Sequence, residues 1–114
     1  MGSLVPGPYR GRLVAMARPT KLDEAALTAW LGSHEGWERR GDEIRKAYTF
    51  DAYAAGVAFA VRVAFAAEKA NHHPDLAIGY GKVEVRLSTH DAAGLTRLDL
   101  DLAEACDRLF ASGR

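Results

Sequence analysis

Residues 51–88 read DAYAAGVAFAVRVAFAAEKANHHPDLAIGYGKVEVRLS, and within this stretch the spacing of apolar residues changes from helical to strand-like. The alanine-rich part, from Asp51 to about Asn71, predicts a long helix. Pro74 ends it, because the residue before a proline avoids helical geometry. Leu76–Tyr80 is a candidate short strand, and Lys82–Ser88 alternates apolar and polar residues as a half-buried strand does. A long helix followed by two strands indicates a mixed fold.

The predicted long helix is apolar on two sides, so it needs two packing partners. One partner is the sheet, and the other is a neighbouring helix or a second subunit. The first face consists of Tyr53, Val57, Ala60, Val61, Ala64 and Phe65, and the second stripe consists of Phe59, Val63, Ala66 and Ala70. We expect a small monomer to leave the second stripe partly uncovered, and we therefore expect self-association.

The flanking segments complete the same architecture. Upstream lie a helical segment at Asp23–Leu31 and two strand-like segments at Trp37–Arg40 and Ile44–Phe50. Downstream, a last helix follows Gly94, and the run from Thr96 to Asp99 has the form of a capping box. The order α-β-β-α-β-β-α predicts an α+β fold, with a four-stranded antiparallel sheet and three helices packed on one face.

The composition fits one such domain. The chain has 114 residues, of which 48% are hydrophobic and 26% are charged, and its fifteen basic and fifteen acidic residues cancel. A neutral balance argues against nucleic acid and anionic membranes as partners. The longest apolar stretch, Ala54–Ala67, is interrupted by Arg62 and is too short to span a bilayer. With one cysteine, no internal disulfide can form, and we expect a cytoplasmic location.

The first nineteen residues differ from the rest. They are rich in glycine, proline and arginine and show no periodicity. We expect residues 1–19 to be a flexible N-terminal extension and residues 20–114 to form the folded domain.

The chemistry concentrates where the long helix ends. Glu68 and His72 are four residues apart, which makes them neighbours on a helix, and a carboxylate partner fixes the tautomer of a histidine used for proton transfer. An ordinary surface pair at a helix C-terminus explains the same spacing equally well. His73 precedes Pro74 and should be extended, so its ring should diverge from that of His72. Two such rings can hold two sides of a ligand.

A third histidine, His90, follows the Lys82–Ser88 strand. Three histidines raise the question of zinc, but the chain has no HxxxH or CxxC spacing, and Cys106 falls in an apolar stripe of the last helix. We therefore predict no metal site. The simplest role for Asp99 is that of the capping-box carboxylate.

These residues form a longer pattern. The chain reads Glu68-x-x-x-His72-His73-Pro74, five residues, Tyr80, nine residues, His90, eight residues and Asp99. This spacing resembles the signature of the pterin-4a-carbinolamine dehydratases. Leu87–Asp99, which reads LSTHDAAGLTRLD, is similar to that family's segment, and Gly36-Trp37 and Tyr48-Thr49-Phe50 fit as well. The resemblance covers roughly residues 20–112.

The resemblance implies a fold, an assembly and a reaction. The family fold has three helices against a four-stranded antiparallel sheet, and members are homodimers or homotetramers. The second stripe of the long helix or an exposed sheet edge would serve such contacts. Members dehydrate 4a-hydroxytetrahydrobiopterin to quinonoid dihydropterin in tetrahydrobiopterin recycling, and they need no cofactor.

By the same resemblance, His72 and His90 are the acid/base pair, and His73 binds and orients the pterin. Glu68 would orient His72, and Asp99 would shape the pocket through the helix cap. We therefore expect the three histidine rings to converge on one cleft. A non-catalytic role stays open, either as a pterin-binding protein or as a transcription-factor dimerisation partner, because animal members of the family also have the latter role.

Overall fold

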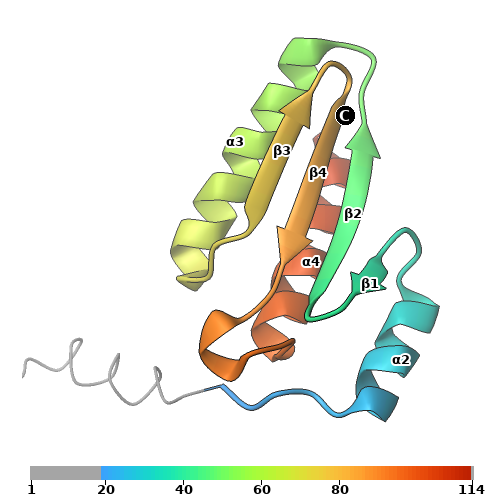
Figure 1. The fold of residues 1–114 in the computed structure, drawn as a ribbon. Helices are drawn as coiled ribbons and strands as arrows, with labels where there is room; N and C mark the ends of the chain where they lie inside the picture. The colour runs from blue at the N-terminus through green and yellow to red at the C-terminus, as the bar shows by residue number, and fades with distance from the viewer. Residues whose placement is uncertain (1–18, 114) are drawn as a thin grey trace, which may run out of the picture.

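The computed structural model describes residues 19–113 (Figure 1). The elements are α2 (Glu24–Ser33), β1 (Glu38–Arg40), β2 (Glu43–Thr49), α3 (Tyr53–Ala70), β3 (Asp75–Gly79), β4 (Lys82–Leu87), the 3-10 turn η2 (His90–Ala92) and α4 (Arg97–Ser112). The α+β class and the predicted order of helices and strands are confirmed. Nearly all of the predicted N-terminal extension lies outside the described residues.

The four strands form an antiparallel sheet in the order β1-β2-β4-β3. In the central pair, Ile44 lies opposite Leu87 and Tyr48 lies opposite Val83, and all four side chains are buried. The residues between them, such as Arg45 and Arg86, point to the other face, because side chains alternate along a strand. The sheet therefore has one apolar face, covered by helices, and one polar face.

Helix α3 packs on the sheet through the stripe that we expected to be partly uncovered. Phe59 and Val63 are fully buried, and the Phe59 ring lies 4.7 Å from that of Tyr48, between centroids. In contrast, Phe65 is 72% exposed and Val61 is 49% exposed. The Phe59 stripe therefore faces the sheet and is covered except at its C-terminal end, where Ala70 is exposed, and the more exposed apolar face is the one that contains Tyr53, Val61 and Phe65.

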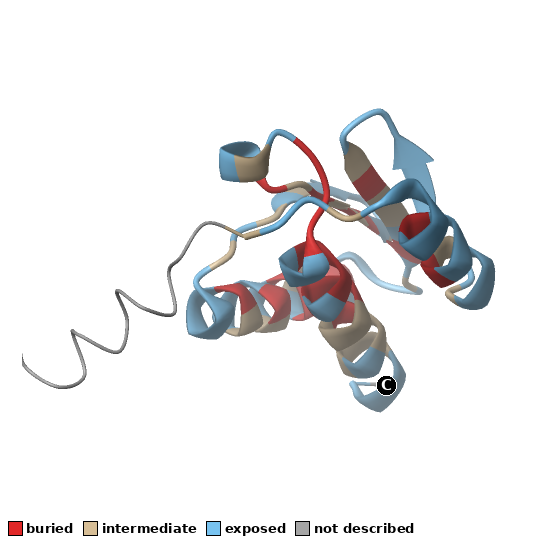
Figure 2. Cartoon of the chain, turned by 90° about the horizontal axis from the view of Figure 1, so that it is seen from below, coloured by how far each residue is buried: buried red, intermediate tan, exposed pale blue. Residues whose placement is uncertain are grey.

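Gly56, on the covered side of α3, lets the helix come close to the sheet. A side chain at Gly56 would begin 3.3 Å from atoms of both Phe50 and Val83, which is tighter than most packed contacts. The glycine thus permits close approach on this side. Figure 2 shows the buried residues gathered where α3, α4 and the sheet meet.

Helix α4 begins with the predicted capping box. The Thr96 side chain accepts a hydrogen bond from the Leu98 backbone, and the Asp99 side chain accepts one from the Thr96 backbone N–H. Asp99 is fully buried, which is unusual for a carboxylate unless it is paired. Among residues 19–113, no helix is long and apolar enough to cross a membrane.

Candidate active site

His72 lies beyond the helix rather than on it. Helix α3 ends at Ala70, and Asn71 adopts a left-handed conformation with φ of 52°. Asparagine tolerates this geometry, which commonly ends helices. The turn directs the His72 ring toward α4, where its Nε2 lies 2.6 Å from Oδ1 of Asp99. The side chain of His72 is 10% exposed and that of Asp99 is fully buried.

This pairing corrects the expected role of Glu68. The i,i+4 argument assumed that the helix continues through His72, and the left-handed turn at Asn71 breaks that geometry. Oε2 of Glu68 instead lies 2.9 Å from Nε2 of His73, and the two side chains are 74% and 57% exposed. The carboxylate that holds His72 is Asp99.

Asp99 is itself held by two threonines. Its Oδ2 accepts hydrogen bonds from the Thr89 hydroxyl at 2.7 Å and from the Thr96 backbone N–H at 2.9 Å. The two threonine hydroxyl oxygens lie 2.8 Å apart. The predicted capping function of Asp99 is present, and the same carboxylate also fixes a histidine. Both carboxylate oxygens are therefore used, which a buried charge requires.

His90 has a different environment. It opens the short turn η2 directly after β4, and it is exposed. Across the described part of the chain, its ring forms no hydrogen bond or ion pair with a protein group. Ala93, in a left-handed conformation with φ of 53°, closes the turn. Within residues 19–113, no protein group thus occupies the ring nitrogens of His90.

The three histidines line one cleft of about 1090 Å³. Its walls come from the end of α3, the turn after β4, the start of α4 and the segment that precedes α2. Besides the histidines, the lining includes Thr89 and Thr96. It also includes six residues that were not candidate site residues, namely Lys21, Leu22, Asp23, Arg97, Leu98 and Asp101. Glu68 and Asp99 are not part of the lining, so their influence passes through the histidines that they contact.

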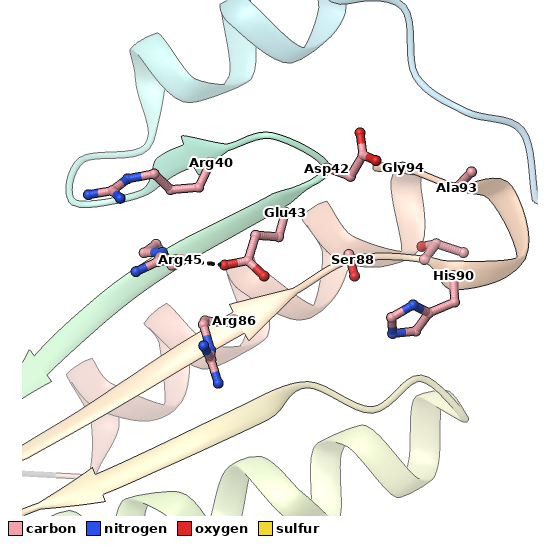
Figure 3. A pocket seen from close by; sticks show the side chains of 10 residues that line it. Arg40, Asp42, Glu43, Arg45, Arg86, Ser88, His90, Ala93 and Gly94 are labelled. Carbon is pink, nitrogen blue, oxygen red and sulfur yellow. Dashed lines mark hydrogen bonds and ion pairs between the residues drawn. The ribbon is translucent and has the colours of Figure 1, made fainter.

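A smaller hollow of about 420 Å³ adjoins the cleft on the polar face of the sheet. It shares Ser88, Thr89 and His90 with the cleft. Figure 3 shows His90 at one end of this hollow and Arg45 at the other. Arg45 is already paired with carboxylates, at 3.0 Å from Glu43 and 3.6 Å from Glu84. The hollow therefore extends the polar surroundings of His90.

The sequence raised two further possibilities, a reactive Cys106 thiol and a metal site. Burial raises the pKa of the Cys106 thiol to about 12, and a buried protonated thiol is unreactive. Within residues 19–113, no group of three or more histidine, cysteine, aspartate or glutamate side chains is placed to hold a metal ion.

Comparison with known proteins gives a consistent picture. The sequence pattern of the family described as pterin 4 alpha carbinolamine dehydratase matches residues 20–109. A Roseiflexus sp. (strain RS-1) protein is 47% identical over 91 residues, which cover 80% of this chain and 98% of that protein. A Sinorhizobium medicae protein is 50% identical over 99 residues, covering 85% and 93%. Both carry provisional names as pterin-4-alpha-carbinolamine dehydratases.

Solved structures share the fold. The transcriptional coactivator/pterin dehydratase from Brucella melitensis superimposes with a TM-score of 0.76 at 28% identity, covering 79% of this chain and 98% of that chain. A pterin dehydratase-like RuBisCO assembly factor of the alpha-carboxysome has a TM-score of 0.57 at 23% identity, covering 69% and 94%, and this likeness concerns the fold alone. On the sequence match, the chain belongs to the pterin-4a-carbinolamine dehydratase family.

Proposed function

We propose that the chain dehydrates 4a-hydroxytetrahydrobiopterin to quinonoid dihydropterin, acting as a hydro-lyase in tetrahydrobiopterin recycling. The observation that carries this proposal is the convergence of His72, His73 and His90 on one cleft. Family membership supports the same reaction class.

The reaction explains why histidines suit this cleft. A hydroxyl leaves carbon 4a as water while a proton leaves a ring nitrogen, so the leaving oxygen needs an acid and the nitrogen needs a base. Groups that titrate near neutrality suit both tasks, and positioned acid–base catalysis contributes about 10²–10⁴-fold. The substrate carries its own leaving group, so the chemistry calls for no metal or redox cofactor.

The contacts support different roles for the three histidines. His72 and His90 form the acid/base pair, with His72 held by Asp99 and His90 free to approach the ligand. His73 binds and orients the pterin, and Glu68 holds its ring. In this scheme the two carboxylates are positioning residues, because each acts through a histidine.

The test is a direct assay. Freshly generated 4a-carbinolamine is mixed with the purified chain, and formation of the quinonoid product is followed against the uncatalysed rate. We expect a clear acceleration that depends on protein concentration. If the chain binds a stable pterin analogue without accelerating dehydration, the proposed reaction is wrong and the non-catalytic pterin-binding role replaces it.

We also propose that the chain forms a homodimer or homotetramer, through the exposed α3 face rather than the Phe59 stripe. Phe65, Val61 and Tyr53 expose 72%, 49% and 53% of their area on this helix, and apolar surface gathered in this way commonly marks an interface. The same face would serve a different protein, as in the alternative of a transcription-factor partner. A cytoplasmic location also stays a prediction.

Replacing Phe65 by Glu should shift the assembly toward monomer, because it places a charge in the apolar contact. Sedimentation velocity measures this shift. Thr28→Glu, at an exposed position on α2, is the matched control and should leave the assembly unchanged. A wild-type chain that remains monomeric at high concentration would contradict self-association.

A further inference from the structure

Thr89 is a buried polar residue that the proposed reaction does not use. It lies between β4 and η2, it is 5% exposed, and neither its burial nor its position in the sequence marks it as a reacting group. Yet its side chain is the direct neighbour of the carboxylate that holds His72. Through this contact, Thr89 can influence the position and protonation of the His72 ring.

Thr96, Thr89 and Asp99 form a continuous chain of hydrogen bonds. Oδ2 accepts from the Thr96 backbone N–H at 2.9 Å and from the Thr89 hydroxyl at 2.7 Å. A hydroxyl has one proton, and that of Thr89 is given to Asp99. The 2.8 Å contact between the two threonine oxygens must therefore use the proton of Thr96. The chain of donors runs from Thr96 through Thr89 to the carboxylate.

This arrangement fixes the orientation of the Asp99 side chain. With two donors on Oδ2, the carboxylate cannot rotate without losing both, and Oδ1 is left facing Nε2 of His72 at 2.6 Å. A carboxylate oxygen accepts a hydrogen bond, so Nε2 carries the proton. In the neutral ring, the other nitrogen, Nδ1, then has the free lone pair.

The backbone of Thr89 supports the turn that carries His90. Its N–H donates to the carbonyl oxygen of Gly94 at 2.9 Å, and its carbonyl oxygen accepts from the Ala92 N–H at 3.0 Å. These two bonds close the turn that carries His90. Thr89 thus acts on both predicted acid/base histidines. Its side chain contacts Asp99, which holds His72, and its main chain closes the turn that carries His90.

We propose that Thr89 is a positioning residue that acts through Asp99 to hold His72 in the Nε2–H tautomer, with Nδ1 as the nitrogen that exchanges protons with the ligand. The link to turnover rests on the proposed function. The link to the tautomer does not, because it concerns only the protein's own hydrogen bonds. The two parts can therefore be tested separately.

The tautomer is measured by ¹⁵N NMR of the His72 ring, at a pH where the imidazole is neutral. We expect Nε2–H in the wild-type chain and in Thr89→Ser, which keeps the hydroxyl. Thr89→Val has nearly the same shape without the hydroxyl, and we expect a mixture of tautomers. With the carbinolamine, its kcat should fall by about 10- to 100-fold, as misplacement of a reacting group does. KM should change little, and Thr89→Ser should restore the rate.

Two controls separate positioning from general destabilisation. Thr49→Val removes an exposed hydroxyl from β2, and Val63→Ala weakens the core away from the cleft. Both should keep the Nε2–H tautomer and the wild-type kcat, even though Val63→Ala should melt at a lower temperature. A structural role for Thr89 would predict that Val63→Ala and Thr89→Val behave alike.

Several outcomes would overturn the proposal. A wild-type chain with the Nδ1–H tautomer overturns it regardless of whether any variant folds. Equal kcat and equal tautomer in Thr89→Val and wild type also overturn it, as does a Thr89→Ser variant that behaves like Thr89→Val. If the wild-type chain shows no turnover but Thr89→Val loses the Nε2–H tautomer, the positioning stands and the proposed dehydration fails.

Discussion

His72 and His73 are adjacent in the sequence and have opposite surroundings. The His72 side chain is 10% exposed and contacts a carboxylate that is fully buried, whereas His73 is 57% exposed and contacts Glu68, which is 74% exposed. The left-handed turn at Asn71 separates them. The comparison teaches that a histidine pair at a helix end can combine one rigid ring with one adaptable ring.

The two pairs differ in their exposure to solvent. Removing one partner of a buried hydrogen bond typically costs about 1–3 kcal/mol, because the other group is left without water or partner. An exposed pair contributes about 0–1 kcal/mol, because water replaces each partner. Substitutions at the His72–Asp99 pair should therefore affect activity and folding together, and those at the His73–Glu68 pair should have small, separable effects.

The largest effect is expected for His72→Gln. The amide of glutamine can still donate a hydrogen bond to Asp99, so the buried carboxylate keeps a partner and the chain should fold. The group cannot exchange protons near neutral pH, so kcat for carbinolamine dehydration should fall by about 10²–10⁴-fold. Single-turnover kinetics measures the change, and a normal rate would exclude His72 as an acid or base.

Asp99→Asn is expected to have the next largest effect. One amide oxygen can serve as an acceptor for the Thr89 and Thr96 donors, but the NH₂ group then faces Nε2 of His72 and favours the other tautomer. The buried network loses a charge-assisted bond, so the free energy of unfolding should fall by about 1–3 kcal/mol. Urea denaturation measures the stability, and kcat should fall as well. If neither changes, Asp99 serves the helix cap alone.

The elements of the fold were predictable, but the choice between two apolar stripes on α3 was not. Periodicity identifies which residues share a face, as it does for Phe59 with Val63, but it does not say which face the sheet covers. In the structure, two features identify the face that packs on the sheet. The Phe59 ring packs against Tyr48, and Gly56 leaves room for the helix to approach the sheet closely. Both depend on the partner surface, which lies elsewhere in the chain.

The family resemblance led us to expect the three histidines at one cleft, which they line, whereas the carboxylate that contacts His72 was not predictable. The i,i+4 rule pairs Glu68 with His72 only while the helix continues, and a single left-handed residue, Asn71, ends it first. Asp99 is twenty-seven residues from His72 in sequence, and its capping role gave a sufficient explanation by itself. Asp99 stands between Leu98 and Leu100 in the sequence, but its burial, which calls for a second partner, is visible only in the structure.

A smaller effect is expected for His73→Ala. The ring is mostly exposed and its partner is solvated, so folding should be unaffected. Its assigned role is to orient the pterin, so the Kd for a stable pterin analogue should rise while kcat for bound substrate changes less. Isothermal titration and saturation kinetics measure the two quantities. Equal losses in kcat and kcat/KM would instead indicate an interaction formed in the transition state.

The smallest effect is expected for Glu68→Gln, and this variant gives the sharpest contrast with Asp99→Asn. Both changes replace a carboxylate by an amide next to a histidine, but Asp99 is buried and accepts two further hydrogen bonds, whereas Glu68 is exposed. The free energy of unfolding should change by less than about 0.5 kcal/mol, as for most surface substitutions. Analogue binding should weaken slightly, because the His73 ring is held less firmly, and added salt should reduce the difference from wild type by screening the exposed pair. Urea denaturation and titration at two salt concentrations measure both effects. A loss of kcat as large as that of Asp99→Asn would mean that Glu68 acts on His72 after all, through a rearrangement that the helix end would have to undergo when the ligand binds.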